Sequence, residues 1–165
     1  MHELPGLLGA VLLTAASFAS AANLSVTFVQ PEKFTDAAYR RPYASERDLA
    51  EVERDIERHL QRLAERKLPA SDALQIELLD IDLAGHFEPF QLRGGYDVRI
   101  VRDITPPRIK LRYTLTRGDQ VIAKGEEQLG DMNFMSTGNR YASDDRLRYE
   151  KALLDDWFEK RITRR

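Results

Sequence analysis

Four side chains that can bind metal ions lie close together in the segment DIDLAGHFEP. They are Asp80, Asp82, His86 and Glu88. On a strand, the carboxylates of Asp80 and Asp82 would point to the same face, about 7 Å apart. Two carboxylates at that distance can share a hard cation, and a following loop can bring His86 or Glu88 to the same ion. One hypothesis is therefore a metal-binding protein or a metal-dependent hydrolase.

The same segment has a simpler interpretation, in which a strand ends and its acids are hydrated. Asp82 would then accept hydrogen bonds from backbone amides of the Leu-Ala-Gly turn that follows. We favour this interpretation because the spacing matches no recognised metal-ligand motif.

Other catalytic chemistry has little support in the sequence. There is no Cys, and no G-x-S-x-G, G-x-G-x-x-G or Walker pattern is present. His59 lies beside the apolar stripe of a predicted helix, where a buried structural histidine is more common than a ligand. The sequence thus favours a protein without catalytic activity and without a cofactor.

Basic side chains alternate along the segment RIKLRYTL. Arg108, Lys110 and Arg112 would share the outward face of a strand, and Arg99 would join them from a neighbouring strand. Few acids stand in obvious register with this face. A solvated surface is the simpler interpretation, but if the protein has a binding face, we expect these residues to bind an anionic ligand or an acidic partner.

The loop GDMNFMSTGNRYAS mixes aromatic and basic residues. Its Phe134, Arg140 and Tyr141 are of the types that are common at interface hot spots. The alternative, which we favour, is that the aromatics fix the loop to its own domain. We expect Arg140 and Tyr141 to form an edge of the binding face.

An apolar run near the N-terminus, LLGAVLLTAASFASAA, predicts export. It has the length of a signal-peptide core and is too short for a membrane span, although no Lys or Arg precedes it. The small residues Ala19 and Ala21 predict cleavage after Ala21, with Ala22 as an alternative. We therefore predict a signal peptide over residues 1–21, a single domain over residues 22–165, and a periplasmic or secreted location.

The composition restricts the possible partners of the remaining 144 residues. Their net charge is −1, which argues against a protein that mainly binds nucleic acid. The sequence contains no second apolar run, so no transmembrane span is predicted for these residues. The lack of Cys excludes disulfides and a lipid-modified cysteine.

Periodicity predicts two helices and five strands. Ser45 and Asp48 can form a capping box at the start of a helix whose apolar stripe ends near Leu68, and Ser143 is expected to open a second helix. The doubled Leu78-Leu79 indicates either a bulge or a strand that is buried on both faces. The expected strands cover 24–29, 74–83, 96–101, 108–115 and 121–129, with a tight turn between the last two.

This order, β-α-β-β-β-β-α, predicts an α+β fold with two layers. A mixed, mostly antiparallel sheet of about five strands would carry both helices on one face. The first helix would connect two parallel strands.

Several segments resemble a family of exported bacterial proteins. VTFVQPEKFTD, DIDLAG, DVRIVRDITPPRIKLRYTL and RLRYEKALLDDWFEKR resemble domain of unknown function 3016, and the likeness covers residues 24–161. The resemblance implies an exported protein of Gram-negative bacteria and supplies no activity, ligand or site residues. Our leading hypothesis is a non-enzymatic module that binds an envelope protein or an anionic ligand.

Overall fold

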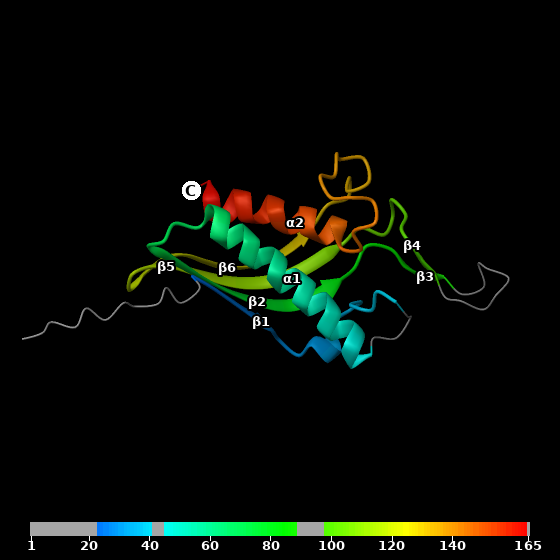
Figure 1. Cartoon of the computed structure of the whole chain (residues 1–165), viewed down its shortest axis with the longest axis horizontal. Coiled ribbons are helices and arrows are strands. Elements are labelled where there is room, and N and C mark those ends of the chain that lie inside the picture. The colour runs from blue at the N-terminus through cyan, green and yellow to red at the C-terminus, as the bar shows by residue number, and fades with distance from the viewer. Residues whose placement is uncertain (1–22, 41–44, 89–97, 165) are drawn as a thin grey trace, which may run out of the picture.

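A four-stranded mixed sheet and two helices form the body of the protein. The computed structural model describes residues 23–40, 45–88 and 98–164. The sheet has the order β1-β2-β5-β6 (Figure 1). Its strands are β1 (Leu24–Phe28), β2 (Asp72–Asp82), β5 (Arg108–Arg117) and β6 (Gln120–Gly130).

Helix α1 (Glu46–Lys67) connects β1 to β2, which are parallel. The predicted capping box is present at its start. The side chain of Ser45 accepts a hydrogen bond from the Asp48 amide, and the Asp48 carboxylate accepts one from the Ser45 amide. These bonds satisfy two amides that a helix start leaves without partners.

The predicted irregularity in β2 is a bulge. The register between β2 and β5 shifts between Leu78 and Asp80. Leu78 and Ile81 are both fully buried, so the extra residue at position 79 returns the apolar side chains to the core face.

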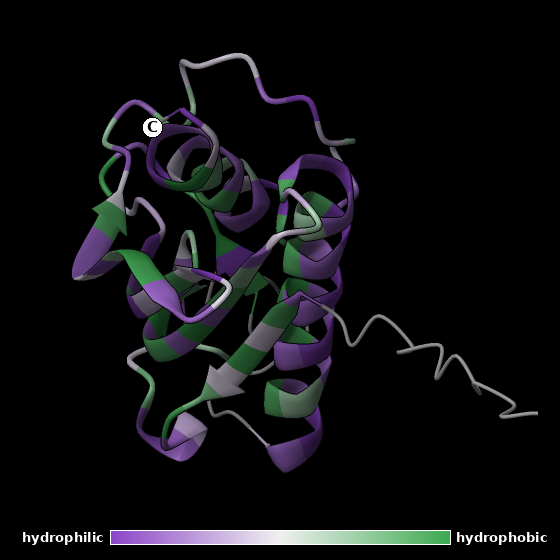
Figure 2. Cartoon of the chain, turned by 90° about the vertical axis from the view of Figure 1, so that its left-hand side faces the viewer, coloured by the Kyte–Doolittle hydropathy of each residue, from purple (hydrophilic) through white to green (hydrophobic). Residues whose placement is uncertain are grey.

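The core lies between the sheet and the two helices. Ile56 and Leu60 of α1 pack with Leu154 and Phe158 of α2 (Arg148–Phe158) in one cluster that includes the inward side chains of β2 and β5. Hydrophobic and hydrophilic residues alternate along both helices, as expected for helices buried on one side (Figure 2). A π-helical turn, Glu159–Thr163, continues α2.

The predicted start of α2 at Ser143 is wrong. The helix begins at Arg148, and Leu147 is its N-cap. Asp145 accepts hydrogen bonds from the Leu147 amide and the Lys151 ammonium, and so it organises a turn before the helix.

The predicted strand at 96–101 does not join the main sheet. Its described part, β4 (Val98–Ile100), pairs with a short strand, β3 (His86–Glu88), in a two-stranded sheet that extends from one end of the molecule (Figure 1). Gly85 precedes this hairpin with φ 76°, and a Cβ there would lie 2.4 Å from the Ile100 carbonyl oxygen. Only glycine fits that conformation and contact.

The predicted fold class is confirmed: an α+β domain in two layers with a mixed sheet. The strands are divided between sheets of four and two. The predicted signal peptide at 1–21 lies outside the described residues. Within the described ranges, no helix combines the length and the apolar character that a membrane crossing requires.

Candidate functional site

The four candidate metal ligands are not brought together. Asp80 binds the loop after β1, where its two carboxylate oxygens accept hydrogen bonds from the Thr35 amide and hydroxyl, each at 2.7 Å. Glu88 accepts hydrogen bonds from Nε and one terminal nitrogen of Arg102, each at 2.8 Å. His86 is half exposed, 3.8 Å from Glu88.

Asp82 has different neighbours. It pairs with Asp36 across an isolated parallel bridge and is 3.9 Å from Arg108. Burial and the nearby Asp36 carboxylate raise the pKa of Asp82. Across residues 23–40, 45–88 and 98–164, no three His, Cys, Asp or Glu side chains are arranged to hold a metal ion.

The basic side chains of β5 do share the outward face of the sheet, but acids from both neighbouring strands pair with them. Arg112 contacts Glu77 of β2 at 2.8 Å and Glu126 of β6 at 2.9 Å, and Lys110 contacts Glu126 at 2.9 Å. Hydrogen bonds from Lys110 and Arg112 lower the pKa of Glu126. The expectation of few acids in register was wrong because those acids come from other strands.

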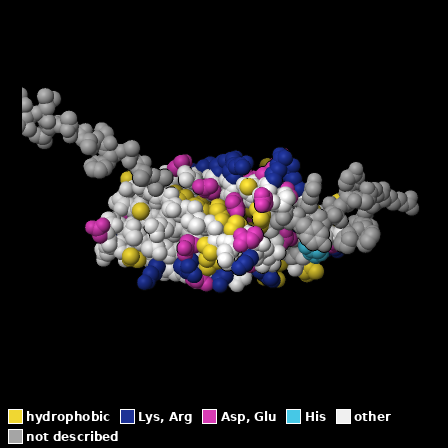
Figure 3. Space-filling view, turned by 90° about the horizontal axis from the view of Figure 1, so that it is seen from below, with side chains coloured by type: hydrophobic (Ala, Val, Ile, Leu, Met, Phe, Trp, Pro, Cys, Tyr) yellow, Lys and Arg dark blue, Asp and Glu magenta, His cyan; other side chains and the backbone are white. Residues whose placement is uncertain are grey.

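Charges of both signs are also interspersed on the side of the molecule shown in Figure 3. The outward sheet face is therefore balanced in charge. Exposed ion pairs of this kind contribute little to stability.

Arg99 lies apart from the β5 side chains, because β4 pairs with β3. Its side chain is 5% exposed, and one terminal nitrogen contacts both oxygens of Asp36 at 2.6 and 2.7 Å. The other terminal nitrogen donates to the Gly85 carbonyl at 2.6 Å. Arg99 thus fixes the turn before β3 to the loop after β1.

Arg140 and Tyr141 both contact a buried carboxylate, that of Asp155 on α2. The Tyr141 hydroxyl donates a hydrogen bond to Asp155, and an Arg140 nitrogen lies 3.1 Å from the same carboxylate oxygen. The ring of His59 on α1 is 3.0 Å from the other oxygen. Burial raises the pKa of Asp155, but the hydrogen bonds outweigh that effect and hold the pKa below its ordinary value.

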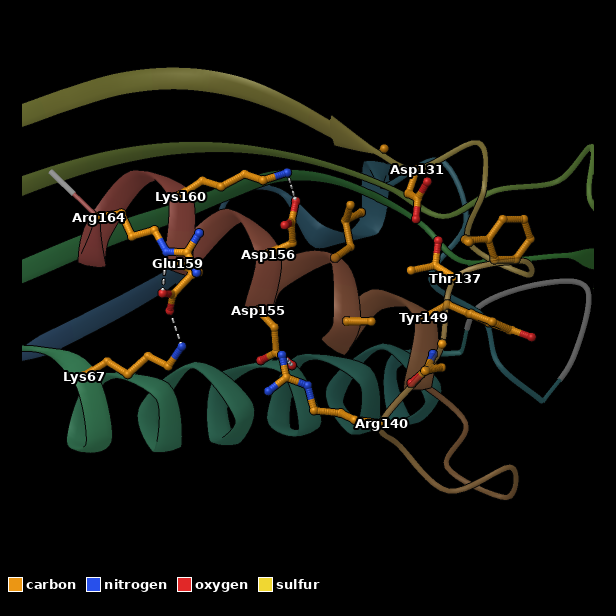
Figure 4. A pocket seen from close by; sticks show the side chains of 16 residues that line it. Lys67, Asp131, Thr137, Arg140, Tyr149, Asp155, Asp156, Glu159, Lys160 and Arg164 are labelled. Carbon is orange, nitrogen blue, oxygen red and sulfur yellow. Dashed lines mark hydrogen bonds and ion pairs between the residues drawn. The ribbon is translucent and has the colours of Figure 1, made fainter.

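Arg140 and Asp155 also line a recess, which we call the α2 cleft. It has a volume of about 640 Å³ and is formed by α2, the π-helical turn, the end of α1 and the loop after β6 (Figure 4). Its charged lining residues are Lys67, Asp131, Arg140, Asp155, Asp156, Glu159, Lys160 and Arg164.

Most charges of the α2 cleft are paired within it. Glu159 contacts Lys67 at 2.5 Å and Arg164 at 2.9 Å, and Asp156 contacts Lys160 at 2.6 Å. Sequence reasoning identified Arg140 but missed these residues. The spacing of four between Asp156 and Lys160 was the available signal, because side chains four apart lie on one helix face.

Fold and site together define a small α+β domain with a charged surface cleft. Residues 22–160 match the model of the family described as protein of unknown function (DUF3016), and the chain belongs to that family. No curated protein and no solved structure matches the chain.

Proposed function

We propose that the protein is an exported, non-enzymatic binding module of the cell envelope, and that the α2 cleft binds a segment of a partner protein. The observation that carries the proposal is the cleft itself, which has a volume of about 640 Å³ and is lined by both acidic and basic side chains. This volume is in the range of protein ligand sites.

The exposed ion pairs of the cleft are suited to exchange partners. The side chains of Lys160 and Asp156 are 65% and 57% exposed, so water competes for both groups. Breaking their ion pair therefore costs little free energy. A polypeptide carries both carboxylates and cationic groups, and it can replace either member of the pair.

The loop that borders the cleft also offers apolar contacts. Met132 and Met135 are 67% and 49% exposed. Methionine side chains adapt to irregular apolar surfaces and are common where proteins bind varied partners.

The chemistry at the base of the cleft supports binding rather than catalysis. Asp155 is buried and accepts hydrogen bonds or ion pairs from three side chains. A carboxylate that is stabilised in this way, with a lowered pKa, is a poor general base at neutral pH.

Export is supported by the apolar run over residues 7–18 and by the small residues at 19–22. The intact mass of the protein purified from the cells that naturally produce it tests this part. We expect a chain that begins at residue 22 or 23, and a product that retains residues 1–21 would contradict export.

Site-directed photo-crosslinking in those cells tests the binding surface. A crosslinking residue in place of Met135 should give a discrete product, whereas one in place of the exposed Glu57 on α1 should not. Lys160→Glu should reduce the product and Lys124→Glu, on β6, should not. Equal products from both crosslinking positions would exclude the cleft as the contact surface.

A further inference from the structure

The sulfur atoms of the protein are concentrated in one loop. The sequence contains no Cys and three Met, and Met1 is the first residue of the chain. The other two, Met132 and Met135, lie three positions apart in the loop after β6. Thiols and thioethers are the side chains that peroxides oxidise most readily. Beyond the first residue, this chemistry is therefore restricted to Met132 and Met135.

Both of these methionines are exposed. The exposed fraction is 67% for Met132 and 49% for Met135. Methionine is ordinarily one of the residue types that are most often buried. Because access to solvent governs how fast a thioether is oxidised, both side chains are open to a small oxidant.

The structure of the loop keeps the two side chains outside. The amides of Ser136 and Thr137 donate hydrogen bonds to the Asn133 carbonyl at 2.8 and 2.9 Å, which closes a turn. Phe134 lies between the two methionines in the sequence and is 5% exposed. Its ring contacts the Tyr149 ring of α2, with 4.8 Å between the centroids. The turn is thus fixed to the domain through Phe134, while its neighbours remain in solvent.

The same loop forms one wall of the α2 cleft. Asp131, Phe134 and Thr137 line the cleft, and the two methionines alternate with them along the chain. A polypeptide segment that occupies the cleft and extends over this wall would meet both thioethers. Their apolar, adaptable side chains suit such a contact.

We propose that Met132 and Met135 are an oxidation site that regulates partner binding at the α2 cleft, an inference that rests on the proposed function. The oxidant is a peroxide. Each thioether sulfur attacks one peroxide oxygen, the O–O bond breaks, and the hydroxide that leaves takes the proton of the transferred hydroxyl. Hydrogen peroxide then yields one sulfoxide and one water; the sulfur loses two electrons and the peroxide gains them.

The sulfoxide changes the surface of the loop but not the core. It converts a flexible apolar side chain into a polar one, which weakens an apolar contact with a partner. Neither methionine belongs to the buried core cluster, so the folded state keeps its stability. Methionine sulfoxide reductases reverse the reaction, so binding can be restored.

Peptide mapping by mass spectrometry tests the oxidation site. The full chain is treated with hydrogen peroxide, which catalase then removes. We expect one added oxygen atom at Met132 and one at Met135, and a melting midpoint equal to that of the untreated chain. Oxygen uptake at other residues before these two, or a lower midpoint after their oxidation, would overturn the inference.

Photo-crosslinking of the purified full chain tests the effect on binding. The crosslinking residue replaces Gly138, which lines the cleft and where a Cβ meets no atom within 4 Å. After incubation with the envelope fraction of the cells that naturally produce the protein, we expect peroxide treatment to reduce the product by about tenfold or more. Treatment with methionine sulfoxide reductases and a thiol should restore it.

Met132→Leu combined with Met135→Leu is the matched control, because leucine is apolar and has no sulfur. This variant should give the same amount of product before and after peroxide. A wild-type product that peroxide leaves unchanged, or that reductases fail to restore, would overturn the inference and leave the α2 cleft as the proposed binding surface. No product before oxidation would contradict the proposed function and the inference together.

Discussion

At the scale of single residues, Glu150 is an ionisable group in the interior. Its carboxyl accepts a hydrogen bond from the Ala84 amide at 2.7 Å. Burial raises its pKa to about 7, although that hydrogen bond and the charge of Arg99 act in the opposite direction. In the unfolded chain the pKa is near 4.5. The folded state therefore holds the proton more tightly, and this contribution to stability is lost as the pH rises from below 4.5 through 7.

We expect Glu150→Gln to gain stability relative to the wild type as the pH rises. Glutamine keeps the acceptor for the Ala84 amide and cannot ionise. Between pH 5 and pH 8 the relative free energy of unfolding should increase by roughly 2–3 kcal/mol, at about 1.4 kcal/mol per pKa unit. Urea denaturation at both pH values measures this. The exposed Glu57→Gln is the control, and a pH-independent difference for Glu150→Gln would show that its carboxyl has an ordinary pKa.

At the scale of elements, the β3–β4 hairpin depends on Gly85. Gly85→Ala would place a methyl group against the Ile100 carbonyl at a residue with positive φ. We expect the free energy of unfolding to fall by about 2 kcal/mol or more, because both the strain and the close contact act on backbone. Chemical denaturation measures the loss. Gly138→Ala, where a Cβ meets no atom within 4 Å, should differ from the wild type by less than about 0.5 kcal/mol.

The two helices depend on the Asp155 carboxylate. Asp155→Ala would leave His59 and the Tyr141 hydroxyl without their buried acceptor. We expect a loss of about 3 kcal/mol in the free energy of unfolding. The adjacent Asp156→Ala removes an exposed ion pair with Lys160 and should cost less than about 1 kcal/mol. Denaturation in urea measures both variants. Similar losses in the free energy of unfolding would argue against the view that Asp155 holds the two helices together.

At the scale of the whole molecule, the sequence predicted the helices and strands better than it predicted which strands pair with each other. The capping box at Ser45 and the α+β class follow from local spacing, and each is confirmed. The doubled Leu78-Leu79 indicated either a bulge or a strand buried on both faces, and the structure has the bulge. The pairing of β4 with β3 was not predictable, because β3 has three residues and lacks a clear period. The start of α2 was misplaced because Asp145 binds Leu147 and Lys151 in a turn instead of capping the helix.

The candidate sites show the same division. Alternation placed Arg108, Lys110 and Arg112 on one face correctly, but their acid partners come from β2 and β6, whose register was open. The α2 cleft combines the loop after β6 with α1 and α2. Such contacts between distant segments leave no periodic signal in one sequence.

The arrangement of the acids across the molecule also predicts the response to metal ions. Asp80 is bound to Thr35, and Glu88 is bound to Arg102, so a cation would have to displace both partners. A ligand at about one hundred times its dissociation constant adds roughly 2.7 kcal/mol to the stability of the folded state. For a domain of this size such binding would raise the melting midpoint by several degrees, at about 2–4 °C per kcal/mol.

We therefore expect the melting midpoint of the full chain in EDTA to remain unchanged when Mg²⁺, Ca²⁺, Mn²⁺ or Zn²⁺ is supplied in excess. Differential scanning calorimetry measures it, with Asp82→Asn as the matched variant. A selective increase with one of these ions that disappears in Asp82→Asn would contradict our assignment. It would instead show that Asp82, whose pKa is raised by burial and by Asp36, moves towards Glu88 of β3 when a cation compensates the repulsion between the two carboxylates.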